Sequence, residues 1–253
     1  MEPTPFLNTV SNTQKAVRSS PVPDRSDAYC LLPTAYSQRG FTLVEMLVVL
    51  AIITLVTLVA ITGQSTFNRS LVLTDTAYTV AFSLREAQTL GLSSRVFNTV
   101  QDAGYGIRFS AATPRSYILF SDLKPASPGS TQSGLCPGHE VASGPDARPG
   151  NCIYNDASEL VRTYTFNQGF RVSGFCGTAL NGTQHCSNSD SHPLDALDIV
   201  YMRPSTDSVI TGVRGSTLTQ FTSALVRVSS PDGAAERCIQ VSKVGQVAVV
   251  TCP

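Results

Sequence analysis

A single carboxylate, Glu45, lies in an otherwise uncharged apolar run that follows the junction between Gly40 and Phe41. The run continues from Met46 to Ile61 without another charge. An acid placed within a membrane helix costs about 2.5–3.5 kcal/mol, so a residue of this kind is functional by default. Because a buried charge needs a partner of opposite sign, the sequence predicts that Glu45 meets a positive charge.

The segment Arg39-Gly40-Phe41-Thr42-Leu43-Val44-Glu45 resembles the leader junction of type IV pilins and type II secretion pseudopilins. The resemblance implies that a prepilin peptidase cuts after Gly40 and that the new amino terminus, Phe41, is N-methylated. The amine of Phe41 is then positive at neutral pH, and it can pair with Glu45 of a neighbouring subunit. The alternatives are a signal anchor with an incidental acid and signal-peptidase cleavage near Gly63.

The first 40 residues are the expected leader and carry four basic and three acidic side chains, in a chain that has 18 of each. They are rich in Pro, Ser and Thr and show no apolar periodicity, so we expect this segment to be disordered and then removed. The mature chain is close to neutral. That balance does not require a polyanionic partner.

The apolar segment, residues 41–62, is the expected transmembrane and filament-core helix. The 21 residues from Phe41 to Ile61 rise about 31 Å as a helix, which is enough to cross a bilayer core. Since the basic leader stays in the cytoplasm, the remainder is expected outside it. The predicted location is a single pass through the inner membrane, followed by an extracellular or periplasmic filament after assembly.

Cysteine usage agrees with an exported protein. Of seven cysteines, Cys30 lies in the leader, which leaves an even number in the mature chain. An even count is typical of an oxidised exported domain, although six cysteines allow 15 pairings. We expect near neighbours to pair, which gives Cys136–Cys152, Cys176–Cys186 and Cys238–Cys252.

Beyond the apolar segment, residues 63–93 are expected to continue the helix in amphipathic form. One stripe of this helix is predicted to lie on a sheet, and Gly91 is a plausible C-cap. The stripe consists of Phe67, Leu71, Tyr78 and Phe82.

From about residue 104 the pattern changes to short strands, and we call residues 94–253 the head. The Gly- and Pro-rich residues 124–151 are expected to form a loop. A long helix followed by strands predicts an α+β fold with the helix packed on an antiparallel sheet. Strands are expected at 104–109, 116–120, 159–166, 169–175, 197–202, 207–213, 222–229, 236–243 and 246–251.

Two further segments resemble the GspH/FimT group of minor pilins and pseudopilins. One is the late-helix string Phe82-Ser83-Leu84-Arg85-Glu86-Ala87-Gln88, and the other runs from Arg237 to Val247. The resemblance implies membership of that group.

Three histidines lie near cysteines in the sequence, which raises the question of a zinc site. They are His139, His185 and His192. No Cys-x2-Cys or His-x3-His spacing accompanies them, and thiols in an oxidising compartment pair with each other. We therefore expect disulfide loops with surface histidines and no metal.

The candidates for catalysis are weak. Asp195 and Asp198 could act as paired carboxylates, but we interpret them as a solvated strand start, and Asp122 as a turn residue. No nucleophile with a base, phosphate loop or nucleotide fingerprint is present, so the sequence predicts neither an enzyme nor a cofactor.

A basic face made by Arg227, Arg237 and Lys243 could contact DNA phosphates, although a solvated face is preferred. The predicted function is a structural subunit, a minor pilin or pseudopilin. The expected partners are prepilin peptidase, other pilin subunits, an assembly platform and its ATPase, and the membrane. The alternative is a tip or DNA-uptake pilin whose head binds a ligand or DNA.

Overall fold

The fold was analysed in a computed structural model, which describes residues 40–93, 95–124, 136, 149–189 and 193–253. Within that part, the side chains of residues 62–67 are not described. Nearly all of the expected leader and most of the expected Gly- and Pro-rich loop lie outside the described residues. The chain divides into two units, residues 1–52 and 53–253, and each is described by itself.

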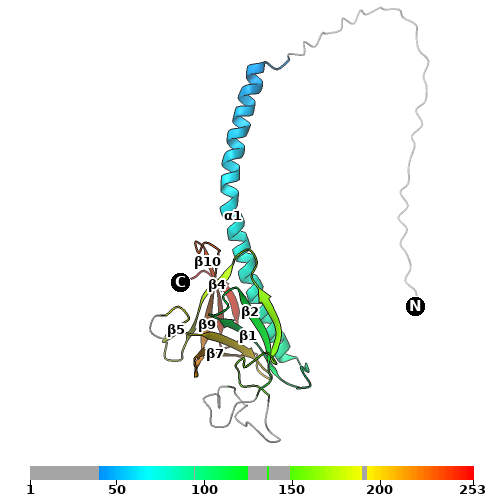
Figure 1. The fold of residues 1–253 in the computed structure, drawn as a ribbon, viewed down its shortest axis with the longest axis vertical. Coiled ribbons are helices and arrows are strands. Elements are labelled where there is room, and N and C mark those ends of the chain that lie inside the picture. Colours follow the sequence, from blue (N-terminus) through cyan, green and yellow to red (C-terminus); the bar gives the residue numbers. More distant parts are fainter. Residues whose placement is uncertain (1–39, 94, 125–135, 137–148, 190–192) are drawn as a thin grey trace, which may run out of the picture. The chain divides into compact units, whose positions relative to one another are not determined.

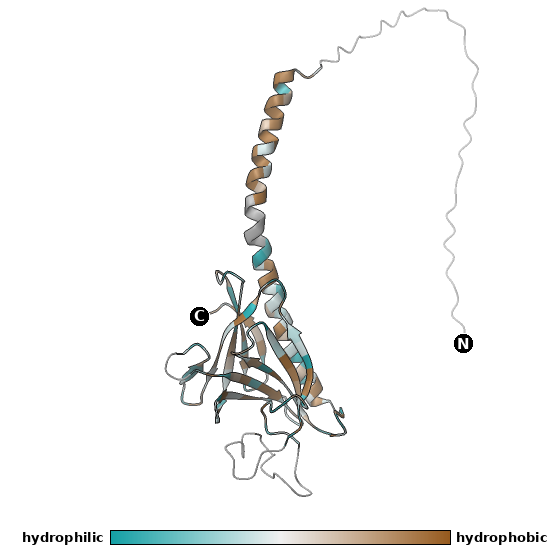
Figure 2. Ribbon diagram, viewed as in Figure 1, coloured by the Kyte–Doolittle hydropathy of each residue, from teal (hydrophilic) through white to brown (hydrophobic). Residues whose placement is uncertain are grey.

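Helix α1 spans Leu43–Leu92 (Figure 1). It contains no proline, and the helix is assigned through Gly63. The first part is apolar along its length, as the hydropathy colouring of Figure 2 shows. The residues from 68 onward belong to the same unit as the head and pack against it.

The described residues of the head form eleven strands, all paired antiparallel, in two sheets. The six-stranded sheet has the order β3-β2-β1-β6-β7-β8, and the five-stranded sheet has the order β11-β10-β9-β4-β5. The strands are β1 (Gly104–Ser110), β2 (Ser116–Asp122), β3 (Leu160–Thr165), β4 (Arg171–Thr178), β5 (Gln184–Cys186), β6 (Ala196–Tyr201), β7 (Ser208–Arg214), β8 (Thr217–Phe221), β9 (Ser223–Ser229), β10 (Glu236–Ser242) and β11 (Val247–Val250).

The predicted α+β class is confirmed, and each of the nine expected strands has a counterpart. Two strands were missed. The short β5 pairs with β4 around the Cys176–Cys186 disulfide. The other, β8, is separated from β9 by Thr222 alone, whose N–H donates to the Thr178 carbonyl at 2.8 Å. The chain passes from one sheet to the other at this residue, so a continuous run of strand residues belongs to two sheets.

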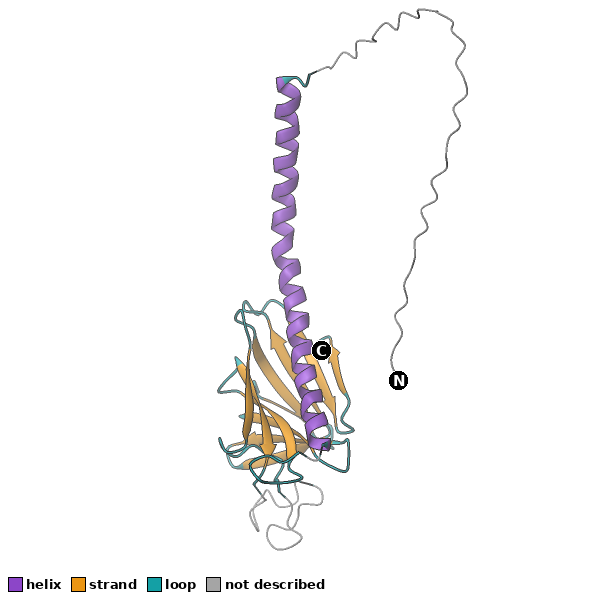
Figure 3. Cartoon of the chain, turned by 90° about the vertical axis from the view of Figure 1, so that its right-hand side faces the viewer, coloured by secondary structure: helices purple, strands orange, loops and turns teal. Residues whose placement is uncertain are grey.

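Both sheets and the second part of α1 contribute to one apolar core, and Figure 3 shows α1 running beside the strands. Large side chains from both sheets, such as Phe109, Ile199, Phe175 and Ile239, are fully buried in it or nearly so. The helix contributes three alanines and three larger aliphatic side chains: Leu73, Ala77, Val80, Ala81, Leu84 and Ala87.

The predicted contact stripe of α1 is therefore wrong. Leu71, Tyr78 and Phe82 are all exposed, and the side chain of Phe67 lies outside the described residues. The helix has two apolar faces after residue 68, and the one with alanines is buried because small side chains let the helix approach the sheets closely.

Gly91 shows the same close approach, and it is not a C-cap. It lies within α1 and does not have a positive φ angle. A Cβ atom at this position would lie 2.2 Å from the carbonyl oxygen of Tyr201 in β6. Glycine is needed here for packing, and the helix ends one residue later.

Candidate functional site

The expected cleavage junction lies just before α1. Gly40 and Phe41 precede the first helical residue, and the Phe41 side chain is 75% exposed. A Cβ atom on Gly40 would have no neighbour within 4 Å. Packing among the described residues therefore does not require a glycine at this position.

Thr42 caps the helix, and analysis of the sequence missed it. The backbone N–H of Glu45 donates to Thr42 Oγ1 at 3.2 Å, and the N–H of Met46 donates to the Thr42 carbonyl at 3.2 Å. These are the contacts of an N-cap residue. The Thr-x-x-Glu spacing from Thr42 to Glu45 is the signature of a capping box, so the signal was present in the sequence.

Glu45 is thus in the first turn of α1, where a negative charge interacts favourably with the helix dipole. Its side chain is exposed. The Glu45 carboxylate therefore lies in the first turn of α1, three residues after the cap residue Thr42.

The apolar segment of α1 is exposed along its whole length in the described residues. Leu43–Ile61 is long and apolar enough to cross a membrane, and none of that segment is buried. Its large apolar side chains are between 44% and 79% exposed. Side chains of this kind require lipid or another apolar surface.

Residues 36–61 match the family model of the prokaryotic N-terminal methylation motif. This motif is the signature of type IV pilins and pseudopilins. It implies processing by prepilin peptidase and assembly with other pilins, and it supports a pilin-like subunit. Together with the apolar helix, it fits a membrane-anchored protein with an extracellular head. No curated protein and no solved structure matches the chain.

The head contains three disulfides: Cys136–Cys152, Cys176–Cys186 and Cys238–Cys252. They are the near-neighbour couples expected from the spacing. Each closes a loop of 10 to 16 residues, for which the chain-entropy model gives about 3 kcal/mol. Cys238–Cys252 ties the end of the chain to β10, and Cys176–Cys186 joins β4 to β5.

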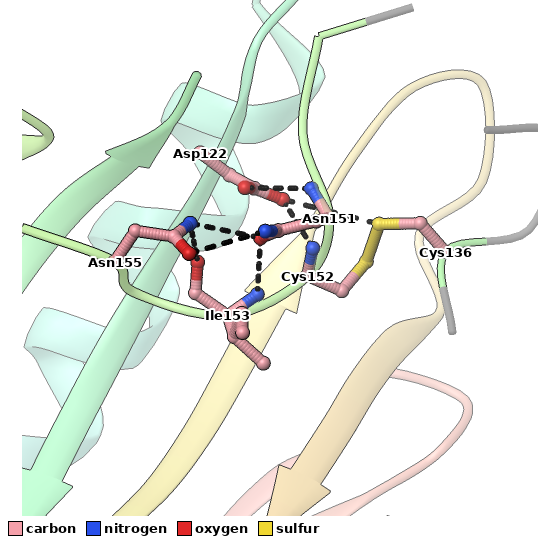
Figure 4. The surroundings of a disulfide bond; sticks show 6 residues. All are labelled: Asp122, Cys136, Asn151, Cys152, Ile153 and Asn155. Atoms are coloured by element: carbon pink, nitrogen blue, oxygen red, sulfur yellow. Dashed lines mark hydrogen bonds between the residues drawn. A yellow bond between two sulfur atoms is a disulfide. The ribbon is translucent and has the colours of Figure 1, made fainter. Parts of the chain in front are cut away.

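The first disulfide lies against a buried acid, Asp122 (Figure 4). The Asp122 carboxylate accepts the backbone N–H of Asn151 at 2.9 Å and that of Cys152 at 2.7 Å, and the Cys136 sulfur lies 3.9 Å away. Burial raises the pKa of Asp122 well above its ordinary value. A Cβ atom on Gly150, whose φ is +105°, would lie 2.7 Å from the same carboxylate.

The interpretation of Asp122 as a turn residue is therefore wrong, because it is the buried last residue of β2. A second buried acid, Glu159, has a similar role. The Glu159 carboxylate accepts backbone N–H groups from Leu123, Lys124 and Asn155 at 2.7 to 3.1 Å. Both acids hold the chain around residues 149–159 against the end of β2. Their role is structural, because they accept hydrogen bonds from backbone N–H groups. The pattern of apolar residues in the sequence does not reveal this role.

The two acids interpreted as a solvated strand start have different environments. Asp195 is exposed and accepts the N–H of Gly215 at 2.6 Å. Asp198 is fully buried, so that interpretation is wrong for it. It lies opposite Arg108 on the neighbouring strand, and the two side chains form an ion pair of 2.8 Å. Burial raises the pKa of Asp198 to about 7, and the nearby Arg108 opposes that shift.

The histidines considered as metal ligands do not form a site within the described residues. His185 packs near Phe221, with ring centroids 5.7 Å apart, while His139 and His192 lie outside the described residues. Within the described part, the group with metal-ligand geometry is Asp122, Cys136 and Cys152. Its two sulfurs are bonded to each other. This cluster is explained by the disulfide and does not indicate a metal centre.

The basic face considered as an alternative does not form. Arg227 lies opposite Cys238 in the pairing of β9 with β10, and alternation along β10 therefore places Arg227 and Arg237 on opposite faces of the sheet. Lys243 follows the end of β10. Arg227 also lies 3.8 Å from Glu236. The three cations do not make one surface for phosphates.

The two segments that resemble GspH/FimT proteins contact each other. The Arg85 guanidinium donates to the Val247 carbonyl at 3.2 Å, and the Gln88 side-chain amide donates to the Gly245 carbonyl at 3.4 Å. These bonds join α1 to the closing hairpin of β10 and β11. Membership of that group stays a prediction.

Proposed function

We propose that this protein is a structural subunit, a minor pilin or pseudopilin, of a type IV pilus-like or type II secretion filament. The observation that carries the proposal is the coincidence of four features within the matched residues 36–61. They are the Gly40–Phe41 junction, the Thr42 cap, the Glu45 carboxylate and the uncovered apolar helix.

The proposed organisation has four parts. Residues 1–40 are a leader that prepilin peptidase removes, and residues 41–62 cross the membrane and later form the filament core. Residues 63–93 continue the helix along the head, and residues 94–253 form the extracytoplasmic head. In this division, each part of α1 has its own environment: lipid or other helices for the first, and the two sheets for the second.

Cleavage at Gly40 would place a new amine at the residue that precedes the Thr42 cap. Methylation of Phe41 keeps that amine positive. In a filament, the Glu45 carboxylate of a neighbour can approach it among apolar helices, where an unpaired charge is costly. The pair would fix the register of one helix against the next, because sliding either helix separates the charges.

The head supports a structural role rather than an enzymatic one. Its buried acids accept backbone N–H groups or pair with Arg108, and each of these contacts holds the fold. Since the basic residues that motivated a DNA-uptake pilin do not share a face, the structural subunit remains our proposal. Its assembly would need prepilin peptidase, a platform protein, an ATPase and other pilin subunits.

The test is the amino terminus of the protein extracted from membranes of cells that contain a prepilin peptidase. Intact mass and amino-terminal sequencing should give a chain that begins at methylated Phe41. A peptidase-deficient strain is the control and should retain residues 1–40. A start near residue 64, or a retained leader in the presence of the peptidase, would contradict the proposal.

A further inference from the structure

The face of α1 that is turned toward β2 and β3 carries polar side chains, and those in the later part of the helix have partners on the sheet. The hydroxyl groups of Ser83 and Tyr117 are 2.8 Å apart. The Tyr164 hydroxyl donates to the Glu86 carboxylate at 2.5 Å. Because the two tyrosines come from β2 and β3, the six-stranded sheet supplies the partners for this part of the helix face.

The same helix face continues toward the start of the head with Asp75, Thr76 and Thr79, which lie eight, seven and four residues before Ser83. The Asp75 carboxylate has no hydrogen bond or ion pair with the described residues. The Thr76 hydroxyl donates to the Val72 carbonyl at 2.7 Å, and the Thr79 hydroxyl donates to the Asp75 carbonyl at 3.0 Å. Since a hydroxyl has a single hydrogen to donate, this part of the face can only accept hydrogen bonds.

A pocket lies between these three side chains of α1 and the aromatic residues of β3 and the turn after it. Its volume is about 360 Å³, within the range of about 300–1,000 Å³ that is typical of small-molecule sites. Tyr164, Phe166 and Phe170 form the aromatic wall. The ring of Tyr117, which also lines the pocket, stacks on Tyr164 at 4.9 Å and lies 5.3 Å from Phe166.

The pocket carries a negative charge without a counter-charge. Among the described residues that line it, Asp75 is the one charged side chain. The Arg162 guanidinium lies over the Tyr164 ring, but it pairs with Glu86 at 3.4 Å and is not part of the lining. The pocket therefore combines an unpaired carboxylate, two hydroxyl acceptors and an aromatic wall.

We propose that this pocket binds a primary alkylammonium group, with the nitrogen at Asp75, Thr76 and Thr79 and the alkyl chain along the aromatic wall. An ammonium group has three N–H donors and no acceptor, which matches a wall that only accepts. Aromatic rings attract a cation, and the methylene groups behind it pack on apolar surface. A lysine side chain of a polypeptide and a free diamine both carry this group. The inference goes beyond the proposed function and does not depend on it.

Three other classes of ligand fit this pocket less well. The Asp75 carboxylate repels an anion. Calcium takes about six to eight oxygen ligands, usually with several carboxylates, whereas the described lining has one. The hydroxyl groups of a carbohydrate both donate and accept, and the α1 wall has no side-chain donor for them. The wall therefore favours a cation with N–H donors.

Titration with n-butylammonium tests the site in the full chain, extracted from membranes in detergent. Threonine residues labelled with ¹³C in their methyl groups report binding through NMR shifts at Thr76 and Thr79. n-Butanol has the same carbon chain without the charge, and tetramethylammonium is a cation without N–H donors. Each control should bind about tenfold more weakly than n-butylammonium, because hydrogen bonds to charged groups are the stronger ones. Equal affinity for either control would overturn the proposal.

Substitution of Asp75 gives a second measurement. Asp75→Asn should weaken n-butylammonium binding about tenfold, whereas Asp207→Asn should leave it unchanged. Asp207 is the matched control because it is also exposed and lies in the loop between β6 and β7, outside the pocket. Thermal unfolding and a non-reducing gel verify that both variants keep the fold and its three disulfides. Unchanged affinity in a folded Asp75→Asn variant would contradict the assignment of the site.

Thr79 tests the hydroxyl acceptors. Thr79→Val should weaken binding about threefold, because it removes one neutral hydrogen bond. Thr79→Ser restores the hydroxyl and should restore the affinity, with the Thr76 methyl group as reporter. A valine variant that binds as well as the serine variant would exclude Thr79 from the site and overturn the proposed set of three acceptors.

Two further ligands distinguish the sources of the ammonium group. Nα-Acetyl-lysine N-methylamide represents a lysine side chain within a polypeptide, and 1,4-diaminobutane represents a free diamine. The one that binds more tightly identifies the source. The outcomes also separate this inference from the proposed function: a chain that begins at Phe41 but binds no amine overturns the pocket alone. A chain that binds n-butylammonium but retains its leader in the presence of the peptidase overturns the proposed function alone.

Discussion

Gly91 of α1 lies so close to Tyr201 of β6 that a Cβ atom on the glycine would be 2.2 Å from the Tyr201 carbonyl oxygen. The contact fixes how closely the last turns of the helix approach the six-stranded sheet. Since the neighbour is a backbone atom in the centre of that sheet, it cannot rotate away as a side chain would. The position therefore tests how α1 packs.

Gly91→Ala should destabilise the protein, although alanine is the better helix former by about 1 kcal/mol. The clash with the Tyr201 carbonyl forces α1 away from the sheet, and overpacking of this kind costs about 1–3 kcal/mol. Denaturant unfolding of the detergent-solubilised protein measures the change. Thr89→Ala, on the exposed face of the same turn, is the control and should change stability by about 0.5 kcal/mol or less. Equal stability of the two variants would contradict the packing argument.

Asp198 should make stability depend on pH. Its folded pKa of about 7 lies above its ordinary value of 3.8, so between these values the folded chain holds a proton that the unfolded chain has lost. Stability then falls as pH rises from about 4 to 7, by as much as about 1.4 kcal/mol per pH unit, and this contribution is constant above pH 7.

Asp198→Asn should make that pH profile flatter, because asparagine does not titrate and can still accept from Arg108. The buried Asp122, whose pKa is also raised, remains as a source of the same dependence. Denaturant midpoints of both proteins at pH 4, 5.5, 7 and 8 measure the difference. Parallel profiles would mean that the Arg108 ion pair keeps Asp198 ionised in the fold throughout this range.

Two substitutions at Glu45 should separate its charge from its position in the capping box. Glu45→Val and Glu45→Gln both remove the charge that would meet the amine of a neighbouring Phe41. Glutamine retains the side-chain acceptor of a capping box, while valine does not. If charge pairing matters for assembly, both variants reach the membrane and both are reduced in sheared filaments. Wild-type incorporation of the glutamine variant would instead assign Glu45 to capping at Thr42.

The number of free thiols should distinguish the uncleaved precursor from the mature chain. The precursor has seven cysteines, of which six form the three disulfides of the head. Cys30 should therefore react as one free thiol in the denatured precursor, and the mature chain should contain none. Titration of both forms without reductant, with peptide mapping of the bonds, measures this. A free thiol in a chain that begins at Phe41 would show that at least one of the three bonds is not formed.

Loss of the Cys136–Cys152 bond should also loosen the backbone that Asp122 binds, in addition to removing the entropic stabilisation of the closed loop. Both cysteines are buried, and the backbone N–H of Cys152 donates to the Asp122 carboxylate. Replacing the pair with alanines should cost about 3 kcal/mol and loosen the chain around residue 152. Hydrogen exchange at Asn151 and Cys152 should rise more than exchange at the β10–β11 pair. Protection that stays equal at both places would contradict the link between this disulfide and Asp122.

The sequence by itself determined the features that depend on composition and spacing. Within 25 residues the sequence contains the junction at Gly40 and Phe41 and the long apolar run with its single acid. Residues 36–61 match the methylation motif. The positions of most strands also followed from local alternation. Local signals sufficed because each depends on neighbours along the chain.

The tertiary structure decided which face of α1 is buried. After residue 68 the helix has one face with Leu71, Tyr78 and Phe82 and another on which alanines lie among Leu73, Val80 and Leu84, and the sequence prediction took the first. The buried face is the second, with Ala77, Ala81 and Ala87, because the helix lies close to the sheets. Periodicity cannot reveal that distance, since it depends on strands more than ten residues away in sequence.

Dependence on residues far away in the sequence also explains why the buried acids were not predicted. Asp198 is buried because β6 pairs with β1, which places Arg108 opposite it. Asp122 is buried because Asn151 and Cys152, far along the chain, supply its backbone partners. A charge enters the core only where distant residues compensate it, and such partners are determined by the pairing of the strands and by the disulfide.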